Sequence, residues 1–463
     1  MTMLYKEIIR VVESVLKKTC SRIVIYSPFF NVLKNTSHHK NFLDQFFDSN
    51  HKRNNSFQGS DIDLKRRFLK NLSRIKFFNG TKFPLRNKKF DLVIVTHYFG
   101  DNSKIEEDLY FSDLIKELKR NNKKILSLKI NHSNKELTEN HTEDTVILPS
   151  NISFFKELVL FLLSIKDTLT LVFKFRKDDF LKRLFFKFLK SGNFLYSLSS
   201  YRLEKILTSY FKDIDCNSLV TTLEGHGREK AIFFAARKAN FSFIAGYQHS
   251  IICESSHSIF NSYLCQRYNP THIFSSIQEA KKIFKSHIDR NIKVVNIGSP
   301  NFRTIVNKSK RNKIILIPEA IHQEYSIFLE LANKLSEFFG SDKVIFRPHP
   351  ALKIDEESKK EFNFEISLEK IEKDISRSFI AIYRGSAAIL PFVYNSAIPI
   401  RFQHSEFKNS CDPLFIFGKK TESCTLQNFS AISSALNEDK KITNDYIKSL
   451  LEFNPSKFIR EIE

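Results

Sequence analysis

The pattern of hydrophobic and polar positions predicts two successive series of strands and helices. In the first series, apolar runs rich in β-branched residues predict strands at 90–96, 124–130, 218–223, 241–247, 272–275 and 294–297, with helices at 105–121, 201–213, 228–239 and 278–287. In the second, strands are predicted at 313–317, 343–346, 379–383 and 398–402, with helices at 323–339 and 386–394. Continuous apolar runs are typical of strands buried on both faces, and their alternation with helices favours parallel sheets. We therefore predict an α/β protein built from two Rossmann-like domains.

Three further segments complete this plan. A helix is expected at 5–18 and a short strand at 23–26. The basic, polar segment 303–312 (RTIVNKSKRN) is the predicted linker. It divides an N-terminal domain, residues 1–302, from a C-terminal domain, residues 313–463.

Residues 152–212 are predicted to be a basic helical insertion in the N-terminal domain. The range 151–212 holds 12 basic and 5 acidic residues, and the part around 174–190 mixes Lys and Arg with Phe and Leu. One interpretation is a helix on an anionic membrane surface, with Lys182, Arg183 and Lys187 facing the lipid. The alternative is an ordinary helix hairpin packed on the sheet, with its lysines in solvent.

The composition also shows that the chain is strongly basic. The chain has 463 residues, a formal net charge of +22, 47 Phe and no Trp. Such a charge points to anionic partners, although Lys, Asn, Ile and Phe are also the residues that AT-rich codons favour. The N-terminus does not have the pattern of a secretory signal, and the sequence contains no uncharged apolar run long enough to span a membrane. Six dispersed cysteines without a C-x-x-C pair predict reduced thiols in a cytosolic protein.

Residues that can bind anions follow two strands of the second series. Arg347 and His349 come directly after strand 343–346, and Arg384, Gly385 and Ser386 come directly after strand 379–383. Arg can bind a phosphate with two hydrogen bonds, Gly allows close backbone approach, and a Ser near a helix N-terminus favours an anion. Because ligands of such sheets bind beyond the carboxyl ends of the strands, these residues predict a phosphate site.

A second polar cluster follows two strands of the first series. The segment 224–229 (EGHGRE) comes after strand 218–223, and Gln248, His249 and Ser250 come after strand 241–247. A carboxylate at a strand end is a candidate general base. The two glycines of 224–229 do not form a dinucleotide-binding fingerprint, because the third glycine is missing. We found no recognisable zinc motif, P-loop or nucleic-acid-binding module in the sequence.

The motifs at these strand ends resemble those of known families. R-P-H-P, followed by R-G-S-A-A and A-I-P-I, resembles the His-Pro and Ser motifs of bacterial GT-B sugar transferases, which include sialyl- and Kdo-transferases and CDP-glycerol-dependent teichoic acid polymerases. E-G-H-G-R-E-K-A, G-Y-Q-H-S and I-G-S-P resemble a family of bacterial surface carbohydrate biosynthesis proteins. Together these similarities cover about 217–402.

These similarities imply a GT-B fold, with two Rossmann-like domains facing a central cleft. They also imply that His349 and Ser386 contact nucleotide phosphates and that Glu224 and Glu229 form the family's glutamate pair. An aromatic residue usual between those glutamates is replaced here by Gly227-Arg228.

The expectation is a nucleotide-sugar-dependent glycosyltransferase that builds a surface polysaccharide, lipopolysaccharide or capsule at the inner face of the plasma membrane. Its donor would be a CMP-activated acidic sugar, bound without a metal or other cofactor, and its acceptor would be lipid-linked or a polysaccharide. The expected roles are donor phosphate binding by Arg347, His349, Arg384, Gly385 and Ser386, catalysis by Glu224, His249 and Glu229, and acceptor contacts by Arg228, Gln248 and Ser250.

Two alternatives stay open at this stage. One is a CDP-alditol phosphotransferase of the teichoic-acid-polymerase type, which would use the same phosphate motifs. The other is a catalytically inactive GT-B scaffold of the polysaccharide assembly machinery. Nucleic acid is not an expected partner.

Overall fold

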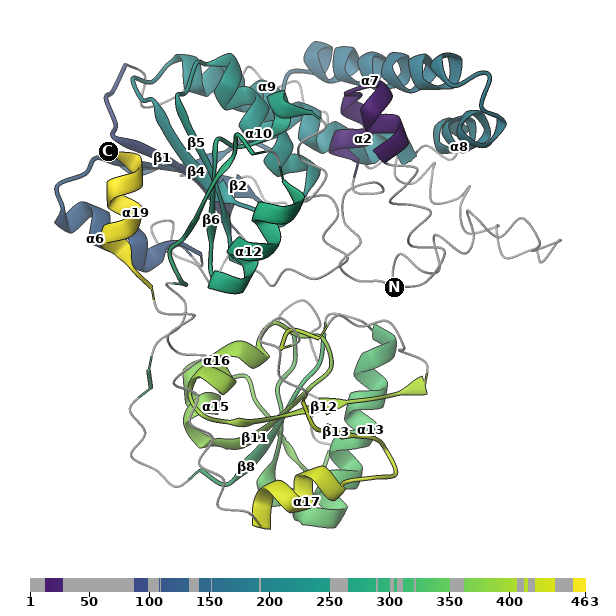
Figure 1. Cartoon of the computed structure of the whole chain (residues 1–463), viewed down its shortest axis with the longest axis vertical. Helices are drawn as coiled ribbons and strands as arrows, with labels where there is room; N and C mark the ends of the chain where they lie inside the picture. The colour runs from purple at the N-terminus through teal and green to yellow at the C-terminus, as the bar shows by residue number, and fades with distance from the viewer. Residues whose placement is uncertain are drawn as a thin grey trace.

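The computed structural model of the chain contains two lobes, each built around a parallel sheet (Figure 1). It describes residues 13–27, 87–98, 108, 110–132, 141–150, 152–190, 193–249, 265–288, 290–299, 304–305, 311–319, 322–349, 362–405, 412–414, 421–437 and 453–463. The predicted fold class, α/β with two Rossmann-like domains, is confirmed.

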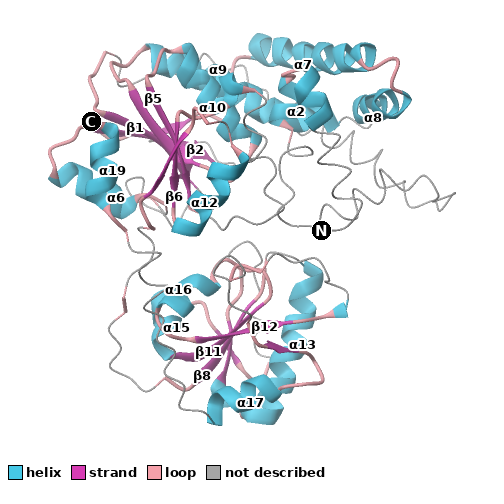
Figure 2. Ribbon diagram, viewed as in Figure 1, coloured by secondary structure: helices cyan, strands magenta, loops and turns pink. Residues whose placement is uncertain are grey.

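The first sheet has seven parallel strands in the order β3-β2-β1-β4-β5-β6-β7. Their bounds are Leu92–Tyr98 (β1), Ile125–Asn131 (β2), Thr145–Leu148 (β3), Ser218–Thr222 (β4), Phe243–Gln248 (β5), His272–Ser275 (β6) and Lys293–Asn296 (β7). The central strands are buried on both faces, as their continuous apolar sequences require. Helices cover the sheet in Figure 2: α6 (Ser112–Arg120), α9 (Leu198–Lys212), α10 (Gly227–Lys238) and α12 (Gln278–His287).

The second sheet has six parallel strands in the order β10-β9-β8-β11-β12-β13. Their bounds are Lys313–Ile317 (β8), Val344–Phe346 (β9), Glu365–Ile366 (β10), Ser378–Tyr383 (β11), Ile398–Phe402 (β12) and Ser423–Cys424 (β13). The helices of this lobe are α13 (His322–Phe339), α15 (Ile371–Arg377), α16 (Ile389–Tyr394) and α17 (Ser430–Asn437). Phe328, Leu331 and Leu335 of α13 pack on the strands in one apolar cluster, which explains the apolar spacing of this helix.

The last helix, α19 (Pro455–Ile462), belongs to the first lobe although it follows the second in sequence. Phe458 is fully buried, with its ring 4.8 Å from that of Phe274 on β6. The ion pair of Lys293 with Glu461 also joins α19 to the first sheet. The last helix of the C-terminal domain expected at 313–463 therefore packs as part of the N-terminal domain.

The segment predicted as a strand at 23–26 is instead a short helix, α2 (Arg22–Tyr26). Its backbone packs against the start of α10, and a Cβ atom on Gly227 would lie 2.2 Å from the carbonyl oxygen of Tyr26. The Tyr26 hydroxyl group donates to the buried carboxylate of Glu204 at 2.8 Å. These tertiary contacts override the β propensity of the Ile-Val-Ile run, because intrinsic propensity is weak beside packing.

The expectation of reduced cysteines is wrong for one pair. Cys20 and Cys265 form a disulfide with a Cα–Cα distance of 5.7 Å, whereas Cys216 and Cys424 are free and buried. The two partners are 245 positions apart in sequence. Sequence spacing could not reveal this pair, because it forms only when the N-terminal segment packs beside the short helix Gln266–Tyr268.

Candidate functional site

Each sheet has a switch point, where the strand order reverses direction. In the first sheet it lies between β1 and β4, and in the second between β8 and β11. Ligands of open α/β sheets bind beyond the carboxyl ends of the strands at such points. The residues that follow β1 and β4, or β8 and β11, are therefore the first candidates for a functional site.

Glu224 is the centre of the cluster at the first switch point. Nε2 of His226 lies 2.8 Å from Oε2 of Glu224, and Nε2 of His249 lies 2.9 Å from Oε1. Two imidazole groups therefore orient one carboxylate. The side chain of Glu224 is 28% exposed and that of His249 is 13% exposed, so the carboxylate is the more accessible of the two. The ring of Tyr110 lies 4.6 Å from that of His249 and forms a wall beside the pair.

Glu229 has a different role from the catalytic one expected. Its two carboxylate oxygens accept hydrogen bonds from the backbone N–H groups of Glu224, Gly225 and His226 at 2.7, 2.7 and 3.0 Å. The side chain is buried, and burial raises the pKa of its carboxyl group. Glu229 thus holds the loop that carries Glu224, at the start of α10, and we revise its role to that of a positioning residue.

Two histidines that the sequence analysis did not single out lie beside this cluster. Arg228 Nη1 lies 3.0 Å from Nε2 of His132, and Nδ1 of His97 lies 3.0 Å from the same atom. Because a guanidinium group can only donate, Nε2 of His132 must accept, and Nδ1 of His97 must carry a hydrogen. Nε2 of His97 then accepts from the Thr222 hydroxyl group at 3.3 Å. Arg228 therefore determines the tautomers of both neutral imidazoles.

Burial and the charge of Arg228 keep both of these histidines neutral. Burial is the larger cause, and together they lower the pKa of His97 to about 3 and that of His132 to about 4. The pKa of Tyr110 is raised to about 12, by burial first and by Glu224 second. At neutral pH the site therefore presents uncharged imidazole and phenol groups around Arg228 and Glu224.

We predict that acid destabilises the fold through His97 and His132. Below the unfolded-state pKa of about 6.5, the unfolded chain binds protons at these positions and the folded chain does not. The free energy of unfolding should therefore fall by up to about 1.4 kcal/mol per pH unit for each residue, from pH 6.5 down to about 4 for His132 and about 3 for His97. Above pH 6.5 the contribution of these two histidines to the free energy of unfolding is constant.

Urea unfolding at pH 7.5 and pH 5 checks this pH dependence, and His97→Gln should reduce the difference between the two unfolding midpoints. The exposed His141 is the matched control, and an equal reduction in His141→Gln would contradict the prediction.

The expected acceptor residues have different positions. Gln248 is fully buried, and its Oε1 accepts from the backbone N–H and hydroxyl groups of Ser276 at 3.3 and 3.4 Å. Its Nε2 is buried without a hydrogen-bond partner among the described residues. Arg228 is half-buried against His132, and Ser250 lies outside the described residues.

At the second switch point, Arg384 is neutralised by two carboxylates. Its Nη2 donates to Glu319 at 2.6 Å and to Glu324 at 2.5 Å, and Arg384 and Glu324 are buried. A Cβ atom on Gly385 would lie 2.6 Å from Oε1 of Glu319. The Glu319 carboxylate therefore lies beside Arg384 and Gly385, where the sequence predicted a phosphate.

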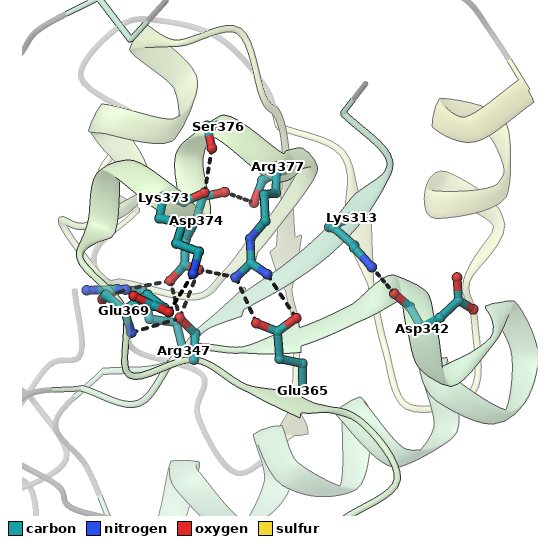
Figure 3. A network of polar contacts seen from close by, with 11 residues as sticks. Lys313, Asp342, Arg347, Glu365, Glu369, Lys373, Asp374, Ser376 and Arg377 are labelled. Carbon is teal, nitrogen blue, oxygen red and sulfur yellow. Dashed lines mark hydrogen bonds and ion pairs between the residues drawn. The ribbon is translucent and has the colours of Figure 1, made fainter. Parts of the chain in front are cut away.

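Arg347 also takes part in an internal ion-pair network, shown in Figure 3. Its Nη1 donates to the fully buried Asp374 at 2.5 Å, and Asp374 also accepts from Arg377 at 2.7 Å and from the Ser367 hydroxyl group at 2.7 Å. The guanidinium group is thus directed to α15. This geometry gives Arg347 a structural role in place of the phosphate contact that the sequence suggested.

His349 and Ser386 are the other two predicted phosphate residues. Burial lowers the pKa of the half-buried His349, and the charge of Glu324 opposes this shift. Ser386 is buried in a turn that precedes α16, whose N-cap is Ala388, so it does not cap that helix. His349 follows β9 and Ser386 follows β11, and strand β8 lies between these two strands.

The basic residues expected at a membrane lie on α8 (Asp179–Lys190). Lys182 and Arg183 are exposed, and the side chain of Lys187 lies outside the described residues. The apolar face of α8 is buried inside the protein through Leu181, Leu184, Phe185 and Phe188. Most of the Phe/Leu face of this helix is therefore packed, as in the hairpin alternative, while Phe180 and Phe186 stay exposed at 47% and 59%.

The same strand-end rule that located Glu224 could have located His97 and His132. His97 lies at the end of β1, and His132 directly follows β2. Both strands were predicted, so the signal was present in the sequence. Their closeness to Arg228 was not predictable, because it depends on β1 pairing with both β2 and β4.

No protein-family model and no curated protein sequence matches this chain. Among solved structures, the UDP-GlcNAc 2-epimerase of Methanocaldococcus jannaschii is similar at 11% identity and a TM-score of 0.48, covering 81% of this chain and 99% of the epimerase. The glycosyltransferase SnogD of Streptomyces nogalater is similar at 8% identity and a TM-score of 0.44, covering 82% and 100% of the two chains. The wall teichoic acid polymerase TagF is similar at 10% identity and a TM-score of 0.42, covering 88% and 97%. These similarities concern the fold alone.

Proposed function

We propose that this protein is a glycosyltransferase that moves a sugar from a nucleotide donor to a hydroxyl group of a polysaccharide or lipid-linked acceptor. The observation that carries the proposal is the Glu224 carboxylate at the first switch point, held by His226 at 2.8 Å and His249 at 2.9 Å. A half-exposed carboxylate oriented from both sides is suited to accept a proton from a bound hydroxyl group.

In the proposed reaction, Glu224 acts as the general base. The acceptor hydroxyl group gives its proton to Glu224 as its oxygen bonds to the anomeric carbon of the donor sugar. The bond from that carbon to the donor phosphate breaks, and the departing nucleotide takes the electron pair. His349 and Ser386, beyond β9 and β11, would contact this phosphate and stabilise its charge. The same residues would serve a CDP-alditol phosphotransferase, in which the transferred group carries its own phosphate.

The charge around the second switch point favours a donor with one phosphate. Arg384 is neutralised by Glu319 and Glu324, and Arg347 by Asp374. At the phosphate itself, a CMP-linked sugar brings one negative charge and a nucleoside diphosphate sugar brings two; the carboxylate of an acidic sugar carries its charge on the sugar, away from these arginines. A CMP-activated acidic sugar is therefore the first donor to test.

A thermal-shift panel of CMP, CDP, UDP and GDP tests the donor nucleotide. Ligand at about 100 times its Kd adds about 2.7 kcal/mol to the free energy of unfolding. We expect CMP to raise Tm by several degrees and His349→Ala to remove that shift, while His141→Ala, a change at an exposed histidine, keeps it. Product mass from sugar and alditol donors then identifies the transferred group. Nucleotide binding without turnover of any donor would support the scaffold alternative, and no binding by any nucleotide would contradict the proposal.

A further inference from the structure

Helix α7 (Phe154–Lys174) turns six of its large apolar side chains outward and several polar ones inward. The exposed side chains are Phe155, Leu158, Val159, Leu162, Leu169 and Phe173. They recur at the spacing of one helix face, and Phe155 and Phe173, at its two ends, are 75% and 68% exposed. We call these six residues the α7 stripe.

The opposite face of α7 is fixed against the protein by polar contacts. It buries Glu157, Ser164 and Thr168 together with Leu160 and Leu171. The carboxylate of Glu157 forms an ion pair with Arg202 of α9. The neighbouring Asp167 accepts from the Tyr201 hydroxyl group at 2.5 Å. A rotation that buried the stripe would break these contacts and expose buried polar groups to apolar surroundings, so the outward direction of the stripe is determined by the fold.

Figure 1 shows α7 along the outer side of the first lobe, on the side away from the second lobe. A contiguous row of exposed large apolar side chains is unusual on a soluble surface and marks a site of contact with a protein or a membrane. Among the described residues, no helix is long and apolar enough to cross a bilayer. The stripe can therefore enter a membrane only as an interfacial helix.

The charges around the stripe distinguish between these two kinds of partner. On α7, α8 and the turn between them, the exposed described side chains include seven basic residues and one acidic residue: Lys156, Lys166, Lys174, Arg176, Lys177, Lys182 and Arg183, against Asp179. Two copies of the chain meeting through this face would bring like charges together. Anionic lipid headgroups would neutralise the basic residues while the stripe enters the acyl boundary.

We infer that the α7 stripe is a docking surface for an anionic membrane, with α8 contributing Lys182 and Arg183 as headgroup contacts. The stripe lies flat in the interface, and Lys166, within the stripe, extends its ammonium group towards the headgroups. This inference does not depend on the proposed reaction, since it rests on a surface of the insertion and not on Glu224.

Co-sedimentation of the full chain with vesicles tests the inference. We expect binding to phosphatidylcholine vesicles that contain phosphatidylglycerol, weak binding to phosphatidylcholine alone, and release at high salt. Leu162→Asp should lower the bound-to-free ratio about tenfold, because it places a charge at the centre of the stripe. The double variant Lys182→Glu with Arg183→Glu should weaken binding to anionic vesicles only. Phe338→Asp is the matched control, since Phe338 is 65% exposed on α13 and should have no effect.

Circular dichroism and the Tm establish that each variant is folded, and light scattering gives the oligomeric state. Unchanged vesicle binding by folded Leu162→Asp would overturn the inference. So would the absence of binding to anionic vesicles, or a dimer in solution that Leu162→Asp converts to a monomer. The nucleotide thermal shift should be the same in all these variants, so failure of this inference is distinguishable from failure of the proposed function.

Discussion

Replacing Glu224 by glutamine is expected to lower kcat for group transfer by roughly 100- to 1,000-fold, which is the usual contribution of a positioned general base. The amide keeps the size of the side chain but cannot accept the proton of the acceptor hydroxyl group. Because Glu224 is half-exposed and the loop is held by Glu229, the fold should persist. The nucleotide thermal shift should also persist, since the proposed donor contacts, His349 and Ser386, lie in the other lobe. Steady-state kinetics with the donor identified by the nucleotide panel provide the measurement.

Matched variants separate the roles within this cluster. Glu117→Gln removes a carboxylate of an exposed ion pair on α6 and should leave kcat unchanged. His249→Gln should cost less than Glu224→Gln if His249 only orients the carboxylate at 2.9 Å. A larger loss in His249→Gln would transfer the role of base to the histidine. Full activity in both variants would remove this cluster from catalysis.

Replacing Asp374 by alanine is expected to destabilise the second lobe by about 3–5 kcal/mol, the cost of removing one partner from a buried ion pair. The carboxylate is fully buried and accepts from Arg347, Arg377 and Ser367 (Figure 3). Its loss leaves the Arg347 guanidinium group without its carboxylate partner, leaves Arg377 with Glu365 alone, and leaves a buried hydroxyl group without its acceptor. Asp374→Asn, which keeps the shape and loses the charge, should fall between alanine and the wild type.

Urea unfolding followed by circular dichroism measures this effect, and a two-lobe chain calls for a fit that allows two transitions. Glu369→Gln is the control in the same region, because its pair with Lys373 is exposed and such pairs contribute less than about 1 kcal/mol. Equal midpoints for Asp374→Ala and Glu369→Gln would show that the buried network does not stabilise the lobe.

Most strands were predictable because their sequences meet a demanding local condition. A run such as Lys313–Ile317 or the start of Leu92–Tyr98 is buried on both faces, and few other structures accept four consecutive apolar residues of this kind. The short run at 23–26 satisfied the same local condition and still formed a helix, because its surroundings are α10 and Glu204 and not a neighbouring strand. The local pattern of apolar residues predicts that a segment is buried more reliably than it predicts whether that segment is a helix or a strand.

The candidate site shows the same division between position and role. The strand-end rule placed Glu224, His249 and Arg384 at the correct edges of their sheets. It could not assign their partners. Arg384 binds Glu319 and Glu324 from segments some 60 residues earlier, and Arg347 binds Asp374 from α15, which was not predicted. An arginine at a strand end can pair equally well with an internal carboxylate or with the phosphate of a ligand. Its position in the sequence therefore does not show which of the two it binds.

By itself the sequence determined the two parallel sheets, the order of their elements along the chain and the strand ends at which polar residues gather, because hydrophobic periodicity is a local property. Only the tertiary structure decided what those residues do. It pairs β1 with β4 and so brings His97 beside Thr222, it uses Glu229 to hold a loop, and it directs the arginines of the second lobe to internal carboxylates. It also turns the α7 stripe outward, because Glu157 on the opposite face of the helix forms an ion pair with Arg202. These outcomes depend on contacts between residues far apart in the chain, which no local pattern contains.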